Sequence, residues 1–285
     1  AQRYFAHYPT LFAPRLEHAL VIGLGTGTTT GTMIAYPWRS IDVVEISQSI
    51  VNAARQYFGD VNHHALDDPR VRLVVADGRN HLMLTEQRYD LITIELSSIW
   101  FAGASSLYNA EFYDVVAERL APGGVLQQWV QLHHVTQRDF ATIVNTIRRR
   151  FPHVALYYGG GQGFVVASLE PLRASQARAA RFQRDPRVAP TLPEAMEPGG
   201  AIIRRNLLSL IDDALLVDAD LDRFLESAAQ AAQVPLEELV SHDDNLYLEY
   251  ATPRGNVLPW SARDELVQTL QSFRRQASVD ALRAP

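Results

Sequence analysis

Residues 19–46, ALVIGLGTGTTTGTMIAYPWRSIDVVEI, hold the pattern that decides the fold. An apolar run leads into a turn with glycine at positions 23, 25 and 27, and a second apolar run ends on Glu45. This order predicts a strand, a turn, a short helix, a second strand and an acid. Because glycine has no Cβ, the turn lets a nucleoside approach the backbone closely. A carboxylate at the end of the second strand can accept hydrogen bonds from ribose hydroxyls.

The glycine spacing favours one nucleoside over a dinucleotide. The dinucleotide pattern is G-x-G-x-x-G, whereas Thr28 stands here where the third glycine belongs. We therefore expect a ligand such as S-adenosylmethionine rather than NAD. A tight turn of no special function is the alternative, and the position of Glu45 argues against it.

The composition of the chain excludes several reaction types and partners. The chain has 285 residues, a net charge of −6, no cysteine and no lysine. Thiolate and Schiff-base chemistry are thereby excluded, and the acidic balance argues against a nucleic-acid partner. No apolar run reaches membrane-spanning length, and no signal peptide is recognisable. The chain begins on Ala1 within a segment that is predicted to be structured, so we expect it to be part of a longer protein.

Two further strands bring acids toward the predicted cleft. Residues 71–75 precede Asp77 and Gly78, and residues 89–94 precede Glu95. In doubly wound sheets, ligands lie beyond the carboxyl ends of the strands. Asp77 is thus placed to meet an adenine amino group, with a plain Asp-Gly turn as the alternative. Glu95 is expected at the mouth of the cleft.

The rest of the first 170 residues completes the predicted fold. A loop with Trp100 and Tyr108 follows Glu95 and is predicted to cover a pocket. Helices near 111–120 and 138–151, a strand near 125–132 and a hairpin over 153–168 come next. The prediction is an α/β fold, a class I S-adenosylmethionine-dependent methyltransferase-like (Rossmann-like) sheet, mostly parallel, with a terminal antiparallel hairpin.

Residues 171–285 are predicted to form a linker and a helical C-terminal extension that packs back on the cleft of the catalytic domain, residues 1–170. Residues 203–240 suggest two helices, and the last 25 or so a surface helix. Asp243 and Asp244 are candidates to hold an amine, and a simple turn is the alternative. The adjacent pair His133-His134 is a poor metal site, because neighbouring strand residues point to opposite faces. We expect no metal.

At this point the residues resemble the spermidine synthase (polyamine aminopropyltransferase) family, and most closely the spermidine-synthase-like domain of membrane-fused bacterial proteins. The matching segments span about 250 residues in the right order. They are QRYFAHYP, ALVIGLGTGTT, IDVVEIS, LDDPRVRLVVADGRNHL, YDLITIE, LYNAEFYDVV, RLAPGGVL and SHDDNLYLEY.

The resemblance implies a role for each matching residue. Glu95 would deprotonate an attacking amine. The predicted nucleoside-binding residues are Gly23, Gly25, Thr26, Gly27, Glu45, Ile46, Asp77 and Gly78. The predicted substrate-binding residues are His7, Ser98, Trp100, Tyr108, Asp243 and Asp244. For His7, the alternative is a simply packed or exposed histidine.

The resemblance also implies partners and a location. The co-substrate would be S-adenosylmethionine or decarboxylated S-adenosylmethionine, and the partner a small-molecule amine. A homodimer, membrane fusion in the full-length protein and a cytoplasmic location are the further expectations.

Two departures from the family pattern leave other functions open. The family carries an acid in the glycine turn, where this chain has Thr26, and a second acid after the fourth strand, where it has Ser98. The acid in the turn attracts the aminopropyl amine and repels a donor carboxylate. Besides aminopropyl transfer, the alternatives are methyl transfer or breakdown of S-adenosylmethionine, and nucleoside binding without catalysis.

Overall fold

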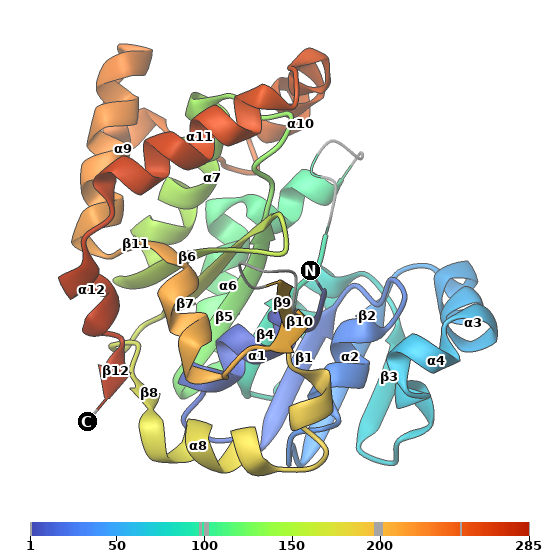
Figure 1. Ribbon diagram of the computed structural model, residues 1–285. Helices are drawn as coiled ribbons and strands as arrows, with labels where there is room; N and C mark the ends of the chain where they lie inside the picture. The colour runs from blue at the N-terminus through green and yellow to red at the C-terminus, as the bar shows by residue number, and fades with distance from the viewer. Residues whose placement is uncertain (1, 97–98, 100–102, 197–201, 246, 285) are drawn as a thin grey trace.

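One twisted sheet forms the centre of the protein, here described from a computed structural model covering residues 2–96, 99, 103–196, 202–245 and 247–284 (Figure 1). Its strands are β1 (His18–Ile22), β2 (Ser40–Glu45), β3 (Val71–Val75), β4 (Tyr89–Ile94), β5 (Leu120–Val130), β6 (His153–Gly159), β7 (Gln162–Ser168) and β11 (Ala214–Val217). Within the described residues, the order is β11-β6-β7-β5-β4-β1-β2-β3. The pairings from β3 through β5 are parallel, and the remaining three are antiparallel. The predicted methyltransferase-like sheet with its terminal hairpin is confirmed.

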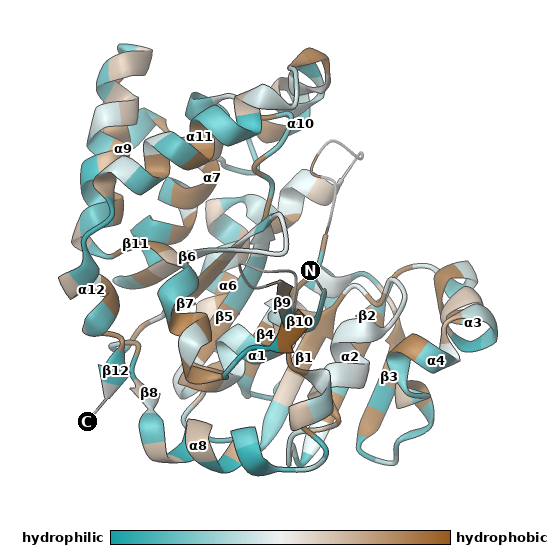
Figure 2. Ribbon diagram, in the orientation of Figure 1, coloured by the Kyte–Doolittle hydropathy of each residue, from teal (hydrophilic) through white to brown (hydrophobic). Residues whose placement is uncertain are grey.

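Helices cover both faces of this sheet. They are α1 (Gln2–Phe12), α2 (Thr28–Met33), α3 (Gln48–Tyr57), α4 (Gly59–Asn62), α5 (Gly78–Leu84), α6 (Ala110–Arg119), α7 (Gln137–Arg150), α8 (Gln176–Arg184), α9 (Ala219–Ala232), α10 (Tyr247–Ala251), α11 (Ser261–Phe273) and α12 (Gln276–Asp280). Helices α5, α6, α7, α9 and α11 share one apolar core with the sheet, whereas α1, α2, α3 and α8 share the other. Figure 2 shows hydrophilic and hydrophobic bands alternating along α8, α9 and α11, as expected for helices that bury one side.

Strand β1 illustrates why the sheet needs both layers. Leu20 and Ile22 belong to one apolar core, whereas Ala19 and Val21 belong to the other. Side chains of a strand alternate between the two faces, so an unbroken apolar run is typical of a strand that is buried on both sides. The run over residues 19–22 therefore fixes β1 in the middle of the sheet.

Capping hydrogen bonds and a tight turn fix several element boundaries. The Ser47 hydroxyl accepts a hydrogen bond from the Ile50 amide at the start of α3. Thr136 and Asp139 form a reciprocal capping box at the start of α7. Residues 160 and 161 form the tight turn between β6 and β7, and both glycines have positive φ angles.

The prediction of two helices over residues 203–240 is wrong in its first half. Residues 208–213 form a 3₁₀ helix, η4 (Leu208–Asp213), and residues 214–217 form β11, which pairs with β6. The sequence ALLV is apolar throughout, and such a short run is compatible with either a strand or a helix. The free edge of β6 decides in favour of the strand. The domain boundary at residue 170 stays a prediction.

Two small sheets complete the structure. Strands β8 (Ala174–Ser175) and β12 (Arg283–Ala284) pair in parallel near the carboxyl end of the described chain. Strands β9 (Glu194–Met196) and β10 (Ile202–Arg204) form an antiparallel pair that lies near the start of α1 in Figure 1. Among the described helices, none combines the length and the apolar character that crossing a membrane requires.

If β11 belongs to the core, truncating its buried side chains must destabilise the whole protein. Leu216 is fully buried, whereas Leu169 is 41% exposed. We expect Leu216→Ala to lower the free energy of unfolding by about 2–5 kcal/mol in urea denaturation, because it leaves a cavity in the core. Leu169→Ala, the matched control, should change it by less than about 0.5 kcal/mol. Equal effects would contradict the placement of β11.

Candidate functional site

The glycine turn lies between β1 and α2, against the end of β4. Gly23, Gly25 and Gly27 all have positive φ angles, which side chains other than glycine rarely adopt. A Cβ built on Gly23 would lie 3.4 Å from the backbone oxygen of Glu95. The turn therefore brings bare backbone next to the carboxyl end of β4.

Glu45 braces this turn from the neighbouring strand. Its Oε2 atom accepts a hydrogen bond from the Leu24 amide at 2.9 Å, and its Oε1 atom accepts one from the Ser47 amide at 2.9 Å. A carboxylate has about four lone-pair positions, so each oxygen can accept a further bond. Ile46, which follows it, is 71% exposed. Glu45 is thus held in place with acceptor capacity left for ligand hydroxyls.

Glu95 lies on the other side of the same turn. Its amide donates to the Ile22 carbonyl at 2.9 Å, and its Oε2 atom accepts from the Thr29 hydroxyl at 2.8 Å. Its Oε1 atom is buried and has no hydrogen-bond partner in the described part of the chain. Burial raises the pKa of Glu95 to about 8, and the Thr29 hydrogen bond offsets only part of this effect.

A buried carboxyl with one unpartnered oxygen can receive a hydrogen bond or a proton from a ligand. Strongly shifted acids of this kind are common at functional sites. The structure thus brings Glu45, the glycine turn and Glu95 together, as the strand order predicted. Their roles toward a ligand stay predictions.

The amino end of α1 covers part of the turn. The Gln2 Oε1 atom accepts a hydrogen bond from the Thr26 hydroxyl at 2.9 Å. A Cβ on Gly25 would lie 3.9 Å from the side-chain Nε2 atom of Gln2. A cavity of about 360 Å³ opens beside these residues, with Thr28 and Gly160 in its lining. Neither Glu45 nor Glu95 lines this cavity. A cavity of about 430 Å³ lies at the amino ends of the strands, so the chemistry around the glycine turn, rather than cavity size, selects the candidate site.

Asp77 and Gly78 follow β3 as predicted, but each already has a local structural task. The Asp77 Oδ1 atom accepts from the Asn80 amide at 2.8 Å and caps α5. A Cβ on Gly78 would lie 2.4 Å from the Ile22 Cγ2 atom, so glycine is needed for α5 to approach β1. Adenine binding by this pair stays a prediction beside these structural roles.

His7 and Tyr108 are buried in the interior and hydrogen bonded there. The His7 Nε2–H donates to the Thr191 carbonyl at 3.0 Å, and its Nδ1 atom accepts from the Tyr36 hydroxyl at 2.7 Å. Burial lowers the pKa of His7 to about 4, so the ring is neutral. The Tyr108 hydroxyl lies 3.1 Å from the Leu96 carbonyl oxygen. These contacts give both side chains a structural role, and substrate binding by them stays a prediction beside it.

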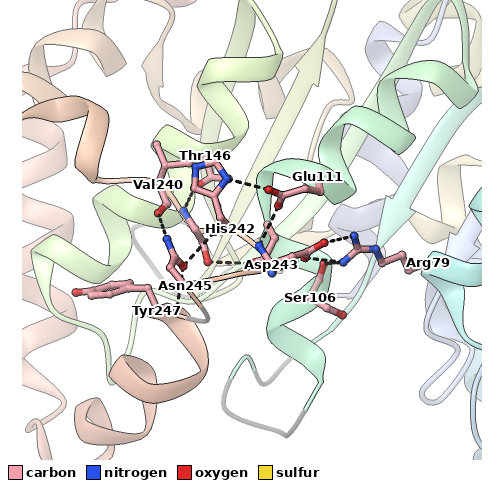
Figure 3. Close-up of polar contacts among 11 residues, drawn as sticks. Arg79, Ser106, Glu111, Thr146, Val240, His242, Asp243, Asn245 and Tyr247 are labelled. Carbon is pink, nitrogen blue, oxygen red and sulfur yellow. Dashed lines mark hydrogen bonds and ion pairs between the residues drawn. The ribbon is translucent and has the colours of Figure 1, made fainter.

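Asp243 joins the carboxy-terminal segment to helix α5 and to the start of helix α6 (Figure 3). Its carboxylate accepts two hydrogen bonds from the Arg79 guanidinium, at 2.7 and 2.5 Å, and a third from the side-chain Nδ2 atom of Asn109 at 3.0 Å. The Asp243 amide donates to Glu111 at 3.0 Å. Its charge is therefore already matched by a cation of the protein, which argues against its predicted role in holding an amine.

Asp244 lies next to this network in an exposed turn, the alternative that the sequence left open. The predicted residues Ser98 and Trp100 lie outside the described residues. The metal-free expectation stays a prediction; within the described ranges, no three histidine or acidic side chains gather as a metal site would require.

Sequence reasoning missed Gln2, Thr29 and Arg79. Gln2 and Thr29 do stand in matching segments of the resemblance, and three consecutive threonines after the turn are a visible polar signal. The partner of Arg79 lies 164 residues further along the chain. Local sequence carries no signal for such a contact.

The fold defines the class: this is an α/β protein with an S-adenosylmethionine methyltransferase-like fold. The family model described as the spermine/spermidine synthase domain matches residues 1–168, and the chain belongs to that family. The membrane-fused subgroup stays a prediction.

Individual proteins of known name are also similar to this chain. The polyamine aminopropyltransferase of Aeropyrum pernix is 34% identical over 161 residues, covering 52% of this chain and 50% of the relative. That of Korarchaeum cryptofilum is 27% identical over 158 residues, covering 53% and 49%. The chain thus spans about half the length of these relatives. The crystal structure of spermidine synthase from Thermotoga maritima has a TM-score of 0.51 at 22% identity, covers 59% of both chains and supports the fold.

The shifted titration of Glu95 makes stability depend on pH. Between its ordinary value of 4.5 and about 8, the folded state keeps a proton that the unfolded state releases. Stability must therefore fall as pH rises through this window. At about 1.4 kcal/mol per pKa unit, the loss amounts to a few kcal/mol.

Glu95→Gln should lack this component. We would measure the unfolding free energy of both proteins by urea denaturation from about pH 5 to about pH 8. The value for the wild type minus that for the variant should decrease steadily as pH rises. Using the difference cancels the other titrating groups. A constant difference across this range would mean that Glu95 titrates normally.

The Arg79–Asp243 pair should contribute measurably to stability. The Arg79 side chain is 20% exposed and that of Asp243 is 40% exposed, so water screens part of the attraction. We expect a double-mutant cycle with alanine to give a coupling of about 1 kcal/mol. The exposed pair Arg39–Glu17 is the control and should give less than about 0.5 kcal/mol. Equal couplings would show that the pair adds nothing beyond a surface contact.

Proposed function

We propose that this protein is an aminopropyltransferase of polyamine biosynthesis, which moves an aminopropyl group from decarboxylated S-adenosylmethionine to an amine and releases methylthioadenosine. The observation that carries the proposal is the buried Glu95 carboxyl, with one unpartnered oxygen, beside a glycine turn that Glu45 braces from the other side. Membership in the spermine/spermidine synthase family supports the same reaction.

The donor would bind by its nucleoside. Its ribose hydroxyls would donate to the free acceptor positions of Glu45, and its adenine would lie toward Asp77 and the exposed Ile46. The three turn glycines leave room for the sulfonium end to pass close to the backbone. Binding then aligns the donor carbon with the incoming amine, which is the main catalytic task because the sulfonium is already a good leaving group.

Glu95 would act as the general base. The amine nitrogen attacks the carbon attached to sulfur, the new C–N bond forms as the C–S bond breaks, and the sulfur keeps the bonding electrons. Before the attack, the ammonium nitrogen of the substrate gives one proton to the ionised Glu95 carboxylate, because only the neutral amine has a lone pair; the product nitrogen leaves as a secondary ammonium. A sulfonium and an amine are both cationic, and their approach lowers the pKa of a nearby carboxyl, so Glu95 can ionise when the ligands are bound.

One observation favours a second candidate, in which the donor is S-adenosylmethionine itself. Thr26 stands in the turn where the resemblance implies an acid, and its hydroxyl is bonded to Gln2 and Thr28 rather than to a charged group. Without a negative charge at this position, the donor carboxylate meets no repulsion from it. Methyl transfer, or breakdown of the donor, would then follow on the same scaffold.

The products decide between the two candidates. We expect incubation with decarboxylated S-adenosylmethionine and a panel of diamines to yield methylthioadenosine and an aminopropylated amine, identified by mass spectrometry. S-adenosylhomocysteine from undecarboxylated donor would favour methyl transfer. Glu95→Gln should lower kcat by about 10²–10⁴-fold, the usual contribution of a general base.

Glu226→Gln, at an exposed position of α9, is the matched control and should retain full activity. Formation of no aminopropylated product with any amine of the panel would exclude the proposed reaction. Unchanged turnover of Glu95→Gln would remove that residue from the base role even if the reaction is observed. A homodimer, a membrane-fused full-length protein and a cytoplasmic location belong to the same proposal.

A further inference from the structure

The Thr29 hydroxyl lies between two hydrogen-bond acceptors. Its Oγ1 atom is 2.8 Å from the Glu95 Oε2 atom and 3.1 Å from the Gln2 carbonyl oxygen. Thr29 is 2% exposed, so water does not readily replace either partner. A threonine hydroxyl carries one proton and can make one ordinary donation at a time.

Both contacts can be full hydrogen bonds in one situation. If Glu95 is protonated, its hydroxyl donates to the Thr29 Oγ1 atom, and Thr29 donates to the Gln2 carbonyl. If Glu95 is ionised, Thr29 must turn its proton toward the carboxylate, and the Gln2 carbonyl gives up its donor. The geometry therefore describes two alternative chains of hydrogen bonds through the same oxygen atom.

We propose that Thr29 is a positioning residue for Glu95, whose hydroxyl reverses direction as Glu95 passes between its protonated and ionised forms. This inference concerns the same site and rests on the proposed function for its catalytic consequence. In the protonated form Thr29 accepts from Glu95, and in the ionised form it donates to Glu95. The second arrangement supplies the ionised carboxyl with a donor in a buried place, so it makes the base form attainable.

Other titratable groups follow the neighbouring strands or lie on α1. They are Glu45 after β2, Asp77 after β3, Arg3 on α1 and the imidazoles of His133 and His134 beyond β5. Glu45 is bonded to backbone amides, and Asp77 caps α5. In the described portion of the chain, no hydrogen bond or ion pair joins Glu95 to any of these groups. Thr29 is thus the side chain whose removal should shift Glu95 directly.

The reversal also gives the site an unusual dependence on Gln2. Gln2 receives the Thr26 hydroxyl through its side chain and the Thr29 hydroxyl through its backbone carbonyl. Ionisation of Glu95 withdraws the second of these bonds while the first can remain. The free-energy cost of ionising Glu95 therefore has two parts: the burial of a charge, and the loss of the hydrogen bond to the Gln2 carbonyl.

The test compares Thr29→Val, which has nearly the same shape but no hydroxyl, with Thr29→Ser, which keeps the hydroxyl. The first readout needs no ligand and no turnover. It is the infrared absorption of the protonated carboxyl, identified as the band that Glu95→Gln lacks, followed as a function of pH. We expect Thr29→Val to move the midpoint upward by about one pH unit, because the ionised form loses its donor. Thr29→Ser should stay close to the wild type.

The second readout is the pH dependence of turnover. In Thr29→Val, kcat should fall about tenfold near neutral pH and recover at higher pH, in parallel with the infrared midpoint, while KM for the donor changes little. An unchanged or lowered midpoint in Thr29→Val would overturn the proposal, as would a Thr29→Ser midpoint equal to that of Thr29→Val. Absence of turnover in the wild type would exclude the proposed function while the infrared titration still decides the role of Thr29.

Discussion

The hydrogen bonds that continue the parallel ladder past the ends of the strands are the constraint on which the site depends. The Glu95 amide donates to the Ile22 carbonyl, and the Gly23 amide donates to the Val44 carbonyl, both at 2.9 Å. These bonds fix the turn between the ends of β2 and β4. Gly23 has a φ of +93°, which would strain any other residue, and its Cα lies close to the Glu95 backbone, so the glycine and the carboxyl positions are set together.

Placing Glu95 there has opposite consequences for stability and for chemistry. Burial disfavours the charged form, so the folded protein is less stable at neutral pH than it would be with an exposed acid. The same burial gives a carboxyl whose protonation can respond to a cationic ligand near neutral pH. Among the residues that the structure describes, one hydroxyl, that of Thr29, donates to the carboxyl, and this leaves the pKa shift of Glu95 large. Under the proposed function, the site thus gives up some stability for a carboxyl whose protonation a cationic ligand can change.

The parts of the site that the sequence predicts are those that strand order determines. Parallel strands end at one edge, so Glu45, Glu95 and the glycines had to meet once the strands were recognised. The buried contacts of His7 could not be predicted, because its partners Tyr36 and Thr191 are distant in sequence and nothing local marks them. The strand β11 was missed for a similar reason: its four apolar residues suit either element, and the edge of β6 makes the choice.

The carboxy-terminal segment shows how far the family similarity reaches. Asp243 binds Arg79 on α5, and the Ser241 hydroxyl donates to Asn109 at the start of α6, so two helices that follow cleft strands are tied to residues beyond the matched range 1–168. Helix α5 carries Gly78 against β1, and α6 begins after the residues that follow Glu95. Because rigid elements position side chains through such packing, the geometry around Glu95 depends on a segment that the family model does not describe. Similarity over the first 168 residues is therefore enough to assign the fold and the family, whereas the shape of the cleft beside Glu95 has to be argued from this chain's own contacts.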